Sequence, residues 1–215
     1  QLVRANRELE RVCRAYRLPC VSGKDSMKND YGTGEHKISI PPTLLFSLFG
    51  DHPDVRKSAT SDFKFAGDKI YLVGSSKQEL GASELAYMMV ESGRAAGIGG
   101  QVPQLPHPEQ NLATYRALST SIRAGWVRTA HDCSEGGLAI ALAEMCIGGR
   151  IGAAVDIDGS GEGDVWGRLW GESLGRFVVA VSPQHEAAFL AAMKGHPTTV
   201  LGEVVADNNL TITDG

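Results

Sequence analysis

A polar cluster followed by two glycines, HDCSEGGL at residues 131–138, has the composition of a binding site for a charged ligand. It runs directly into the apolar segment AIALAEM, so Gly136 and Gly137 are expected to turn the chain sharply into a buried helix. The first turn of such a helix offers free backbone N–H groups and the positive end of the helix dipole, which attract anions. Asp132 and Glu135 beside it indicate a hard cation such as Mg²⁺, which would join a phosphate to the carboxylates.

A structural interpretation of the same residues remains open. Ser134 can cap the helix while Glu135 interacts favourably with its dipole, a common pattern at helix starts. His131 is a candidate general base because it stands beside carboxylates and a glycine loop, although a lone histidine more often bonds a backbone carbonyl. Cys133 has no activating neighbour except His131, so we do not expect it to act as a nucleophile.

A second polar cluster, SGKDSMK at residues 22–28, follows a short apolar run. Lys24 is a point charge suited to phosphate, Asp25 is a cation ligand, and Ser26 is a hydroxyl donor. The spacing is not that of a nucleotide P-loop, because the earlier glycine of that motif is missing and Asp25 separates Lys24 from Ser26. The alternative is a solvated hairpin tip, since loops of this composition are common.

Composition describes an ordinary globular protein, with 42% hydrophobic and 21% charged residues in a chain of 215. The net charge of −4 and the lack of an arginine or lysine stripe argue against nucleic acid as a partner. No apolar run reaches the ~18 residues of a membrane span. The four cysteines sit in apolar contexts without the pairing of a metal site, which indicates reduced thiols in a cytoplasmic protein.

The hydrophobic pattern predicts helices and strands in mixed order, and therefore an α+β fold of mixed α/β layers. Residues 1–16 read as an amphipathic helix without a start signal, which suggests a piece of a longer protein. Strands are expected at 18–22 and 38–50, and the polar segment 51–68 is the candidate domain junction. Beyond it we expect helices at 82–93, 109–124, 137–147 and 186–194, and strands at 69–74, 127–130, 153–157, 176–182, 200–205 and 210–213.

Five motifs, in this order, resemble the second half of the phosphoribosylformylglycinamidine synthase family: SGKDSM at 22–27, KISIPPTLL at 37–45, LGAS at 80–83, HDCSEGGL at 131–138 and ESLGRF at 172–177. The resemblance spans essentially the whole chain. It implies an aminoimidazole ribonucleotide synthetase-like C-terminal domain preceded by part of the N-terminal domain. We accordingly expect a partial N-terminal-type α/β domain in residues 1–60 and a C-terminal-type α+β domain in residues 61–215.

The resemblance also implies a reaction and its partners. The family uses ATP and Mg²⁺ to convert formylglycinamide ribonucleotide and glutamine-derived ammonia to formylglycinamidine ribonucleotide in purine biosynthesis. A glutaminase domain or subunit supplies the ammonia. The family's catalytic histidines belong to the first half of the protein, so the resemblance implies no catalytic residue in this chain, and we expect the chain alone to be inactive.

By the same resemblance, individual residues acquire roles. Asp132 is expected to hold Mg²⁺ and Ser134 to contact substrate, while Gly136 and Gly137 present N–H groups to phosphate. In the other cluster, Gly23 contacts nucleotide, and Lys24 and Ser26 contact substrate or phosphate. Smaller family members carry asparagine where this chain has Lys24, so a metal role there would pass to Asp25.

Two other functions stay open on the sequence. One is a different ATP-using enzyme of the superfamily, such as a small-molecule kinase or synthetase. The other is a non-catalytic half that binds a nucleotide structurally. Because the apolar run at residues 44–49 has lost much of its expected domain, we also predict that the chain forms a homodimer through residues 1–50.

Overall fold

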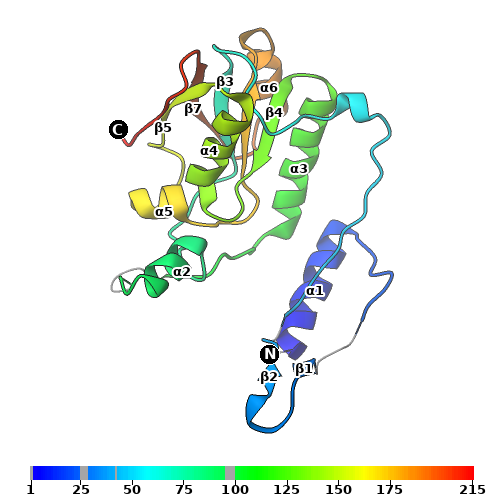
Figure 1. Ribbon diagram of the computed structural model, residues 1–215. Helices are drawn as coiled ribbons and strands as arrows, with labels where there is room; N and C mark the ends of the chain where they lie inside the picture. The colour runs from blue at the N-terminus through cyan, green and yellow to red at the C-terminus, as the bar shows by residue number, and fades with distance from the viewer. Residues whose placement is uncertain (1, 25–28, 42, 95–99) are drawn as a thin grey trace. The chain divides into compact units, whose positions relative to one another are not determined.

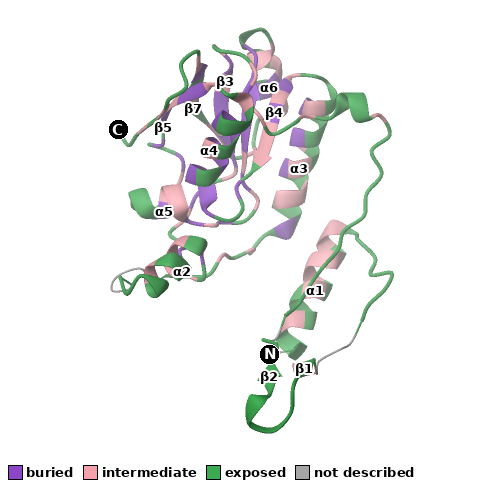
Figure 2. Ribbon diagram, viewed as in Figure 1, coloured by how far each residue is buried: buried purple, intermediate pink, exposed green. Residues whose placement is uncertain are grey.

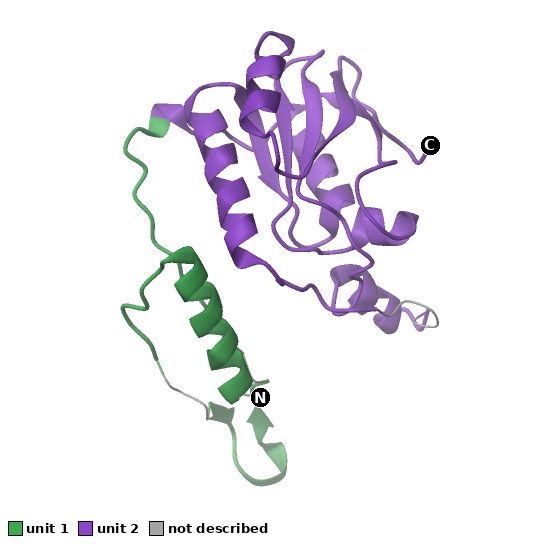
Figure 3. Cartoon of the chain, turned by 180° about the vertical axis from the view of Figure 1, so that it is seen from behind, with its two compact units in different colours: residues 1–55 green, residues 56–215 purple. Residues whose placement is uncertain are grey.

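The computed structural model describes residues 2–24, 29–41, 43–94 and 100–215 of the chain. These residues form two compact units, residues 1–55 and residues 56–215 (Figure 3). The boundary lies inside the polar segment 51–68 that the sequence marks as a junction. That residues 1–60 are part of an N-terminal-type domain stays a prediction.

A six-stranded sheet with the strand order β4-β6-β3-β7-β5-β8 forms the centre of residues 56–215 (Figure 1). Neighbouring strands are antiparallel except for β5 and β8, which run parallel. The expected mixed α+β class is therefore confirmed. The strands are β3 (Lys69–Val73), β4 (Val127–Asp132), β5 (Gly152–Asp156), β6 (Phe177–Val181), β7 (Thr198–Val205) and β8 (Leu210–Thr213).

Helices cover both faces of this sheet, and the alternation of β3 side chains separates the two layers. Ile70 and Leu72 pack in a cluster with residues of α4, whereas Tyr71 and Val73 pack with residues of α3 and α6. Figure 2 shows buried residues along the strands and in α4. The helices are α2 (Glu84–Glu91), α3 (Pro108–Arg123), α4 (Gly137–Gly149), α5 (Val165–Trp170) and α6 (Glu186–Ala192), with single 3₁₀ turns η2 (Val55–Lys57) and η3 (Pro183–His185).

Helix α5 is absent from the sequence-based prediction. Its six residues are too few to display a helical period, and Gly167 lies in its interior. It is held instead by a capping bond, in which the carboxylate of Asp164 accepts from the N–H of Gly167 at 2.9 Å. The helix packs against α4, so it lies beside the HDCSEGGL loop.

Residues 1–55 contain less regular structure than the sequence predicts. The expected first helix is confirmed as α1 (Leu2–Tyr16). The expected strands at 18–22 and 38–50 are wrong: described residues of the first form no strand, and the second contributes only β2 (Ile38–Ser39), which pairs with β1 (Asp30–Tyr31) around the 3₁₀ turn η1 (Gly34–His36). A strand needs a hydrogen-bonding neighbour, and the described part of this unit offers none to residues 43–50.

Candidate functional site

The HDCSEGGL motif lies where β4 ends and α4 begins, and its polar residues border a pocket of about 360 Å³. The opposite wall comes from the ESLGRF motif, which leads into β6. Two of the motifs singled out in the sequence therefore meet at one site, which we call the motif pocket. It is lined by Pro103, Tyr115, Asp132, Cys133, Ser134, Glu135, Glu172, Leu174, Gly175, Arg176 and Phe177.

Two successive glycines build the turn from the motif into α4. Gly136 and Gly137 have φ values of +75° and +64°, in the left-handed region that other residues adopt only with strain. Gly137 also leaves no room for a side chain, because a Cβ there would lie 2.5 Å from the carbonyl oxygen of Gly171. The double glycine thus lets the motif loop lie directly against the backbone that precedes the second wall.

Asp132 and Ser134 bond to each other at the rim of the motif pocket. The hydroxyl of Ser134 donates to the carboxylate of Asp132, and this bond lowers the pKa of Asp132 below its usual range. Ser134 is therefore not the helix cap that the structural interpretation assigned to it: the N-cap of α4 is Gly136, with no side-chain capping bond. Asp132 is exposed and charged, as a cation ligand must be.

The N–H groups of the two glycines already have partners within the protein. Gly137 donates to the carbonyl of Ser134 at 3.0 Å, and Gly136 donates to the carboxylate of Glu172 at 2.9 Å. The same carboxylate oxygen accepts from the N–H of Glu84, the first residue of α2, also at 2.9 Å. In this structure the anion at the start of α4 is thus a side chain of the protein. From the sequence, Glu172 stands out only as the first residue of the ESLGRF motif.

Arg176 is buried behind the motif pocket, with a relative exposure of 1%. Its guanidinium donates to the carbonyls of Ser173 and Gly171 and to the hydroxyl of Ser76, rather than to Glu172. Burial lowers the pKa of this guanidinium, which still stays charged at physiological pH. The pocket therefore combines a buried positive charge with the carboxylates at its rim.

His131 bonds through both ring nitrogens. Nδ1 lies 2.7 Å from the backbone oxygen of Asp132, and Nε2 lies 3.1 Å from the carboxylate of Glu144 on α4. Both ring nitrogens therefore have partners within the protein, and His131 is not among the residues that line the motif pocket. The geometry favours the structural interpretation of His131 over general-base catalysis.

Cys133 points into the core of the sheet layer, where burial raises its pKa to about 11. A thiol with that pKa is almost entirely protonated at neutral pH. The expectation that Cys133 is not a nucleophile agrees with this environment. Burial likewise raises the pKa of Cys146 on α4.

The residues of the SGKDSMK cluster belong to the other unit, residues 1–55. Gly23 and Lys24 are exposed there, while Asp25 and Ser26 lie outside the described residues. Among the described residues no three acidic, histidine or cysteine side chains converge as a metal cage. None of the described helices is both long and apolar enough to cross a membrane.

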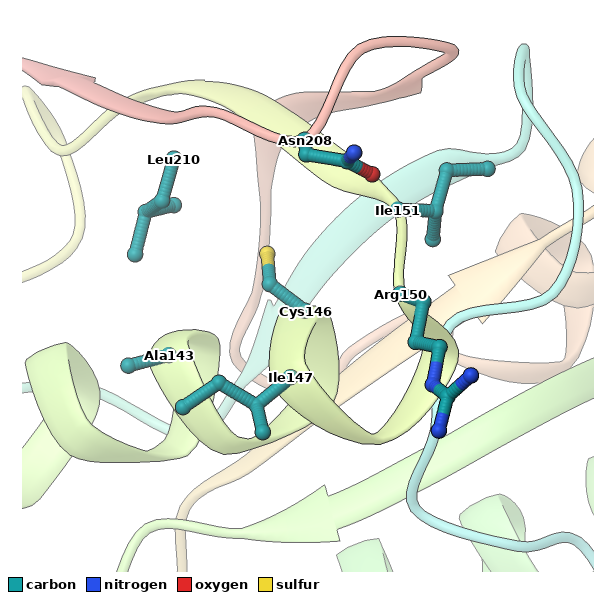
Figure 4. Close-up of a pocket in the computed structure, with 7 residues that line it drawn as sticks. All are labelled: Ala143, Cys146, Ile147, Arg150, Ile151, Asn208 and Leu210. Atoms are coloured by element: carbon teal, nitrogen blue, oxygen red, sulfur yellow. The ribbon is translucent and has the colours of Figure 1, made fainter.

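A second pocket, of about 470 Å³, has a different lining (Figure 4). It is formed by α4 together with residues around the β7–β8 turn, and its side chains are apolar apart from an arginine and an asparagine. It holds no carboxylate and none of the motif residues, so its chemistry does not match a phosphate and metal site. The lining residues are Ala143, Cys146, Ile147, Arg150, Ile151, Asn208 and Leu210.

Comparison with known proteins agrees with the fold. The chain is 36% identical to phosphoribosylformylglycinamidine synthase subunit PurL of Deinococcus radiodurans over 219 residues, which is 99% of this chain but only 28% of that protein. Its fold is similar to that of Thermotoga maritima PurL complexed with ATP, with a TM-score of 0.55 and 20% identity over 74% of this chain and 25% of that one.

The same Thermotoga protein complexed with FGAR gives a TM-score of 0.56 and 21% identity, over 70% of this chain and 26% of that one. This chain therefore spans little more than a quarter of the length of these relatives. Residues 66–215 match the family model described as AIR synthase related protein, C-terminal domain. On that match, the chain belongs to the family of AIR synthase related proteins.

Proposed function

We propose that this chain is the C-terminal part of an ATP-dependent phosphoribosylformylglycinamidine synthase. The observation that carries the proposal is the 36% identity to a PurL subunit along 99% of the chain. The whole enzyme would convert formylglycinamide ribonucleotide, ammonia and ATP to formylglycinamidine ribonucleotide, ADP and phosphate. ATP phosphorylates the carbonyl oxygen of the glycinamide group, and ammonia then attacks that carbon and displaces the oxygen as phosphate.

The motif pocket is our proposed site for a phosphate group of the substrate or nucleotide. Asp132, Glu135 and Glu172 present carboxylates to it, while Arg176 places one buried positive charge behind it. A phosphate alone would meet net negative charge there. A phosphate accompanied by a divalent cation would not, so the charges of the pocket support cation-assisted binding.

Mg²⁺ fits this donor set. The ion usually keeps several waters and takes one or two protein carboxylates together with substrate phosphates, so a cage of three side chains is not required. Asp132, exposed and with a lowered pKa, would hold it, and Ser134 would fix the orientation of that carboxylate. When bound, Mg²⁺ neutralises phosphate charge. Asp25 remains a second proposed ligand, and Gly23, Lys24 and Ser26 remain proposed nucleotide or substrate contacts.

This chain corresponds to only part of a PurL subunit, so the proposed activity requires partners. We propose that the missing N-terminal half of such a synthase completes the active site, since this chain covers only 28% of the PurL relative. A glutaminase would deliver ammonia, and the assembly would work in the cytoplasm. The chain alone would then have no synthase activity, because the family's catalytic histidines lie outside it.

A chimera tests the proposed activity. The aligned C-terminal region of the Deinococcus PurL is replaced by this chain, and formation of formylglycinamidine ribonucleotide from ammonia and ATP is measured. We expect activity in the chimera and none in this chain alone. A folded chimera that binds ADP but makes no product would point instead to a structural nucleotide site, and activity of the isolated chain would refute its dependence on the missing part.

Calorimetry on the chain tests the pocket. We expect ADP or formylglycinamide ribonucleotide to bind more tightly with Mg²⁺ than without it, and Asp132→Asn to remove that difference. Asp158→Asn is the matched control, because Asp158 is also exposed but lies outside the motif pocket. Equal metal dependence in wild type and Asp132→Asn would exclude Asp132 as the ligand.

A further inference from the structure

The end of α1 folds back on itself and brings two cysteines together. The helix stops at Tyr16, and Arg17 takes the left-handed conformation with φ = +57°. The N–H of Leu18 then returns to the carbonyl of Cys13 at 2.9 Å, which fixes the reversal. As a result the sulfur of Cys20 lies 3.8 Å from the sulfur of Cys13.

These two thiols differ from the other pair in the chain. Cys20 is exposed and Cys13 is half-buried, whereas Cys133 and Cys146 are buried in the second unit. A hollow of about 420 Å³ adjoins both Cys13 and Cys20, so a small solute can reach the pair. Proximity and access are the two conditions for a dithiol to be oxidised.

We propose that Cys13 and Cys20 are a redox-sensitive pair, which hydrogen peroxide converts to an intramolecular disulfide. The thiolate of Cys20 attacks one peroxide oxygen, the O–O bond breaks, and Cys20 becomes a sulfenic acid while the other oxygen leaves as water. The thiolate of Cys13 then attacks the sulfur of Cys20 and expels its oxygen as a second water. In total the two thiols give up two protons and two electrons, and one peroxide takes them up to become two waters.

The second step should depend on pH. Burial and the contact with Cys20 raise the pKa of the Cys13 thiol above its ordinary value. Because the attacking species is the thiolate, closure of the disulfide is expected to speed up as the pH rises toward that pKa. At lower pH the sulfenic acid on Cys20 should persist for longer and be open to trapping.

Closure has a structural consequence for the segment that follows. A disulfide brings its sulfurs to about 2.05 Å, so the two atoms approach by roughly 1.8 Å from their present 3.8 Å. The bond would tie Cys20 to the last turn of α1, only three residues before Gly23 and four before Lys24. Oxidation would thereby hold the start of the proposed substrate-binding loop against the helix. The pair itself does not depend on that proposed role.

Peroxide treatment of the native chain, residues 1–215, followed by alkylation and peptide mass mapping, tests this proposal. We expect wild type to lose two thiols, with the peptides of Cys13 and Cys20 linked in one chain and released by dithiothreitol. In Cys13→Ser, the sulfenic acid on Cys20 should instead be trapped by dimedone. Cys146→Ser is the control and should leave the linkage unchanged.

Three results would overturn the proposal. One is a wild-type chain in which Cys20 is oxidised while Cys13 still alkylates. Another is a linkage that joins two chains rather than one, seen as a dimer on a non-reducing gel. The third is trapping of Cys20 by dimedone that is the same in wild type and Cys13→Ser at every pH, because Cys13 would then not resolve the sulfenic acid.

Discussion

The carboxylate of Glu172 accepts a hydrogen bond of 2.9 Å from the backbone N–H of Gly136, the N-cap residue of α4. The same oxygen accepts from the N–H of Glu84 at the start of α2. One side chain thus satisfies orphan donors at the beginnings of two helices, where the helix dipole favours negative charge. Glu172 therefore joins the wall of the motif pocket to both helices and fixes the position of the HDCSEGGL loop.

Removing this carboxylate should destabilise the fold. We expect Glu172→Ala to lower the free energy of unfolding by about 1–3 kcal/mol, because two backbone donors lose a charged acceptor. Glu172→Gln keeps an oxygen acceptor without the charge and should lose less. Urea denaturation followed by circular dichroism measures both.

Glu109→Ala serves as the comparison for Glu172. Glu109 lies in the first turn of α3, so its charge also favours a helix dipole, but in the described structure its carboxylate has no hydrogen-bond partner. Its loss should therefore cost at most about 0.5 kcal/mol. Equal losses in the two alanine variants would mean that the hydrogen bonds of Glu172 contribute nothing beyond its charge.

The double glycine offers a second stability test. Gly137→Ala combines a strained φ with a Cβ that would lie 2.5 Å from a backbone oxygen, so we expect a loss of at least about 3 kcal/mol. Gly125→Ala is the matched control: its φ is +77°, but a Cβ there meets nothing within 4 Å, so it should cost only about 1–2 kcal/mol. Thermal unfolding of the two variants compares them, and a similar melting temperature would contradict the close contact at Gly137.

The sequence predicted the second unit well because its elements carry strong local signals. Strand β6 is a continuous apolar run, and α4 is an alanine-rich segment that two glycines precede. In both segments the hydrophobic pattern and the residues at the boundaries predict the same element. The bond from Glu172 to Gly136 could not be predicted in this way. The two residues are 36 positions apart, and only the tertiary fold brings that carboxylate to the helix start.

In the first unit, residues 1–55, the sequence-based prediction of strands failed. The run at residues 44–49 has the composition of a strand, yet strand formation requires a neighbour that the described chain does not supply. The strand propensity of a segment follows from its own residues, whereas strand pairing depends on a second segment elsewhere in the chain. The Cys13–Cys20 contact was missed for a related reason, since the turn at Arg17 is a left-handed conformation at a residue type that rarely adopts it.

The buried thiol of Cys133 predicts a loss of stability at alkaline pH. Its folded-state pKa, about 11, lies above the unfolded value of 9.0, so the folded chain retains a proton that the unfolded chain releases. The contribution is fully present below pH 9 and disappears as the pH rises toward 11, with a total of about 2–3 kcal/mol.

Urea denaturation at pH 8 and pH 10.5 measures this effect, with Cys133→Ala as the comparison. The variant should be less stable at pH 8 because a packed sulfur is lost, but its stability should fall less between the two pH values. Other groups titrate in both proteins and cancel in the difference. An identical fall in wild type and variant would show that Cys133 ionises as easily in the folded chain as in the unfolded one.

The exposed apolar run of the first unit predicts self-association. Leu45, Leu48 and Phe49 have relative exposures of 87%, 80% and 91%, and α1 contains no buried residue. Contiguous apolar surface of this kind recruits a second chain, most simply as a two-fold dimer.

We expect light scattering to give a dimer for the whole chain and a monomer for residues 56–215, which contain their own two-layered core. The double variant Leu45→Lys/Phe49→Lys should also be monomeric. Ile147→Lys, which changes an exposed apolar residue of the second unit, should remain dimeric. A dimer that survives removal of residues 1–55 would place the interface on the second unit instead.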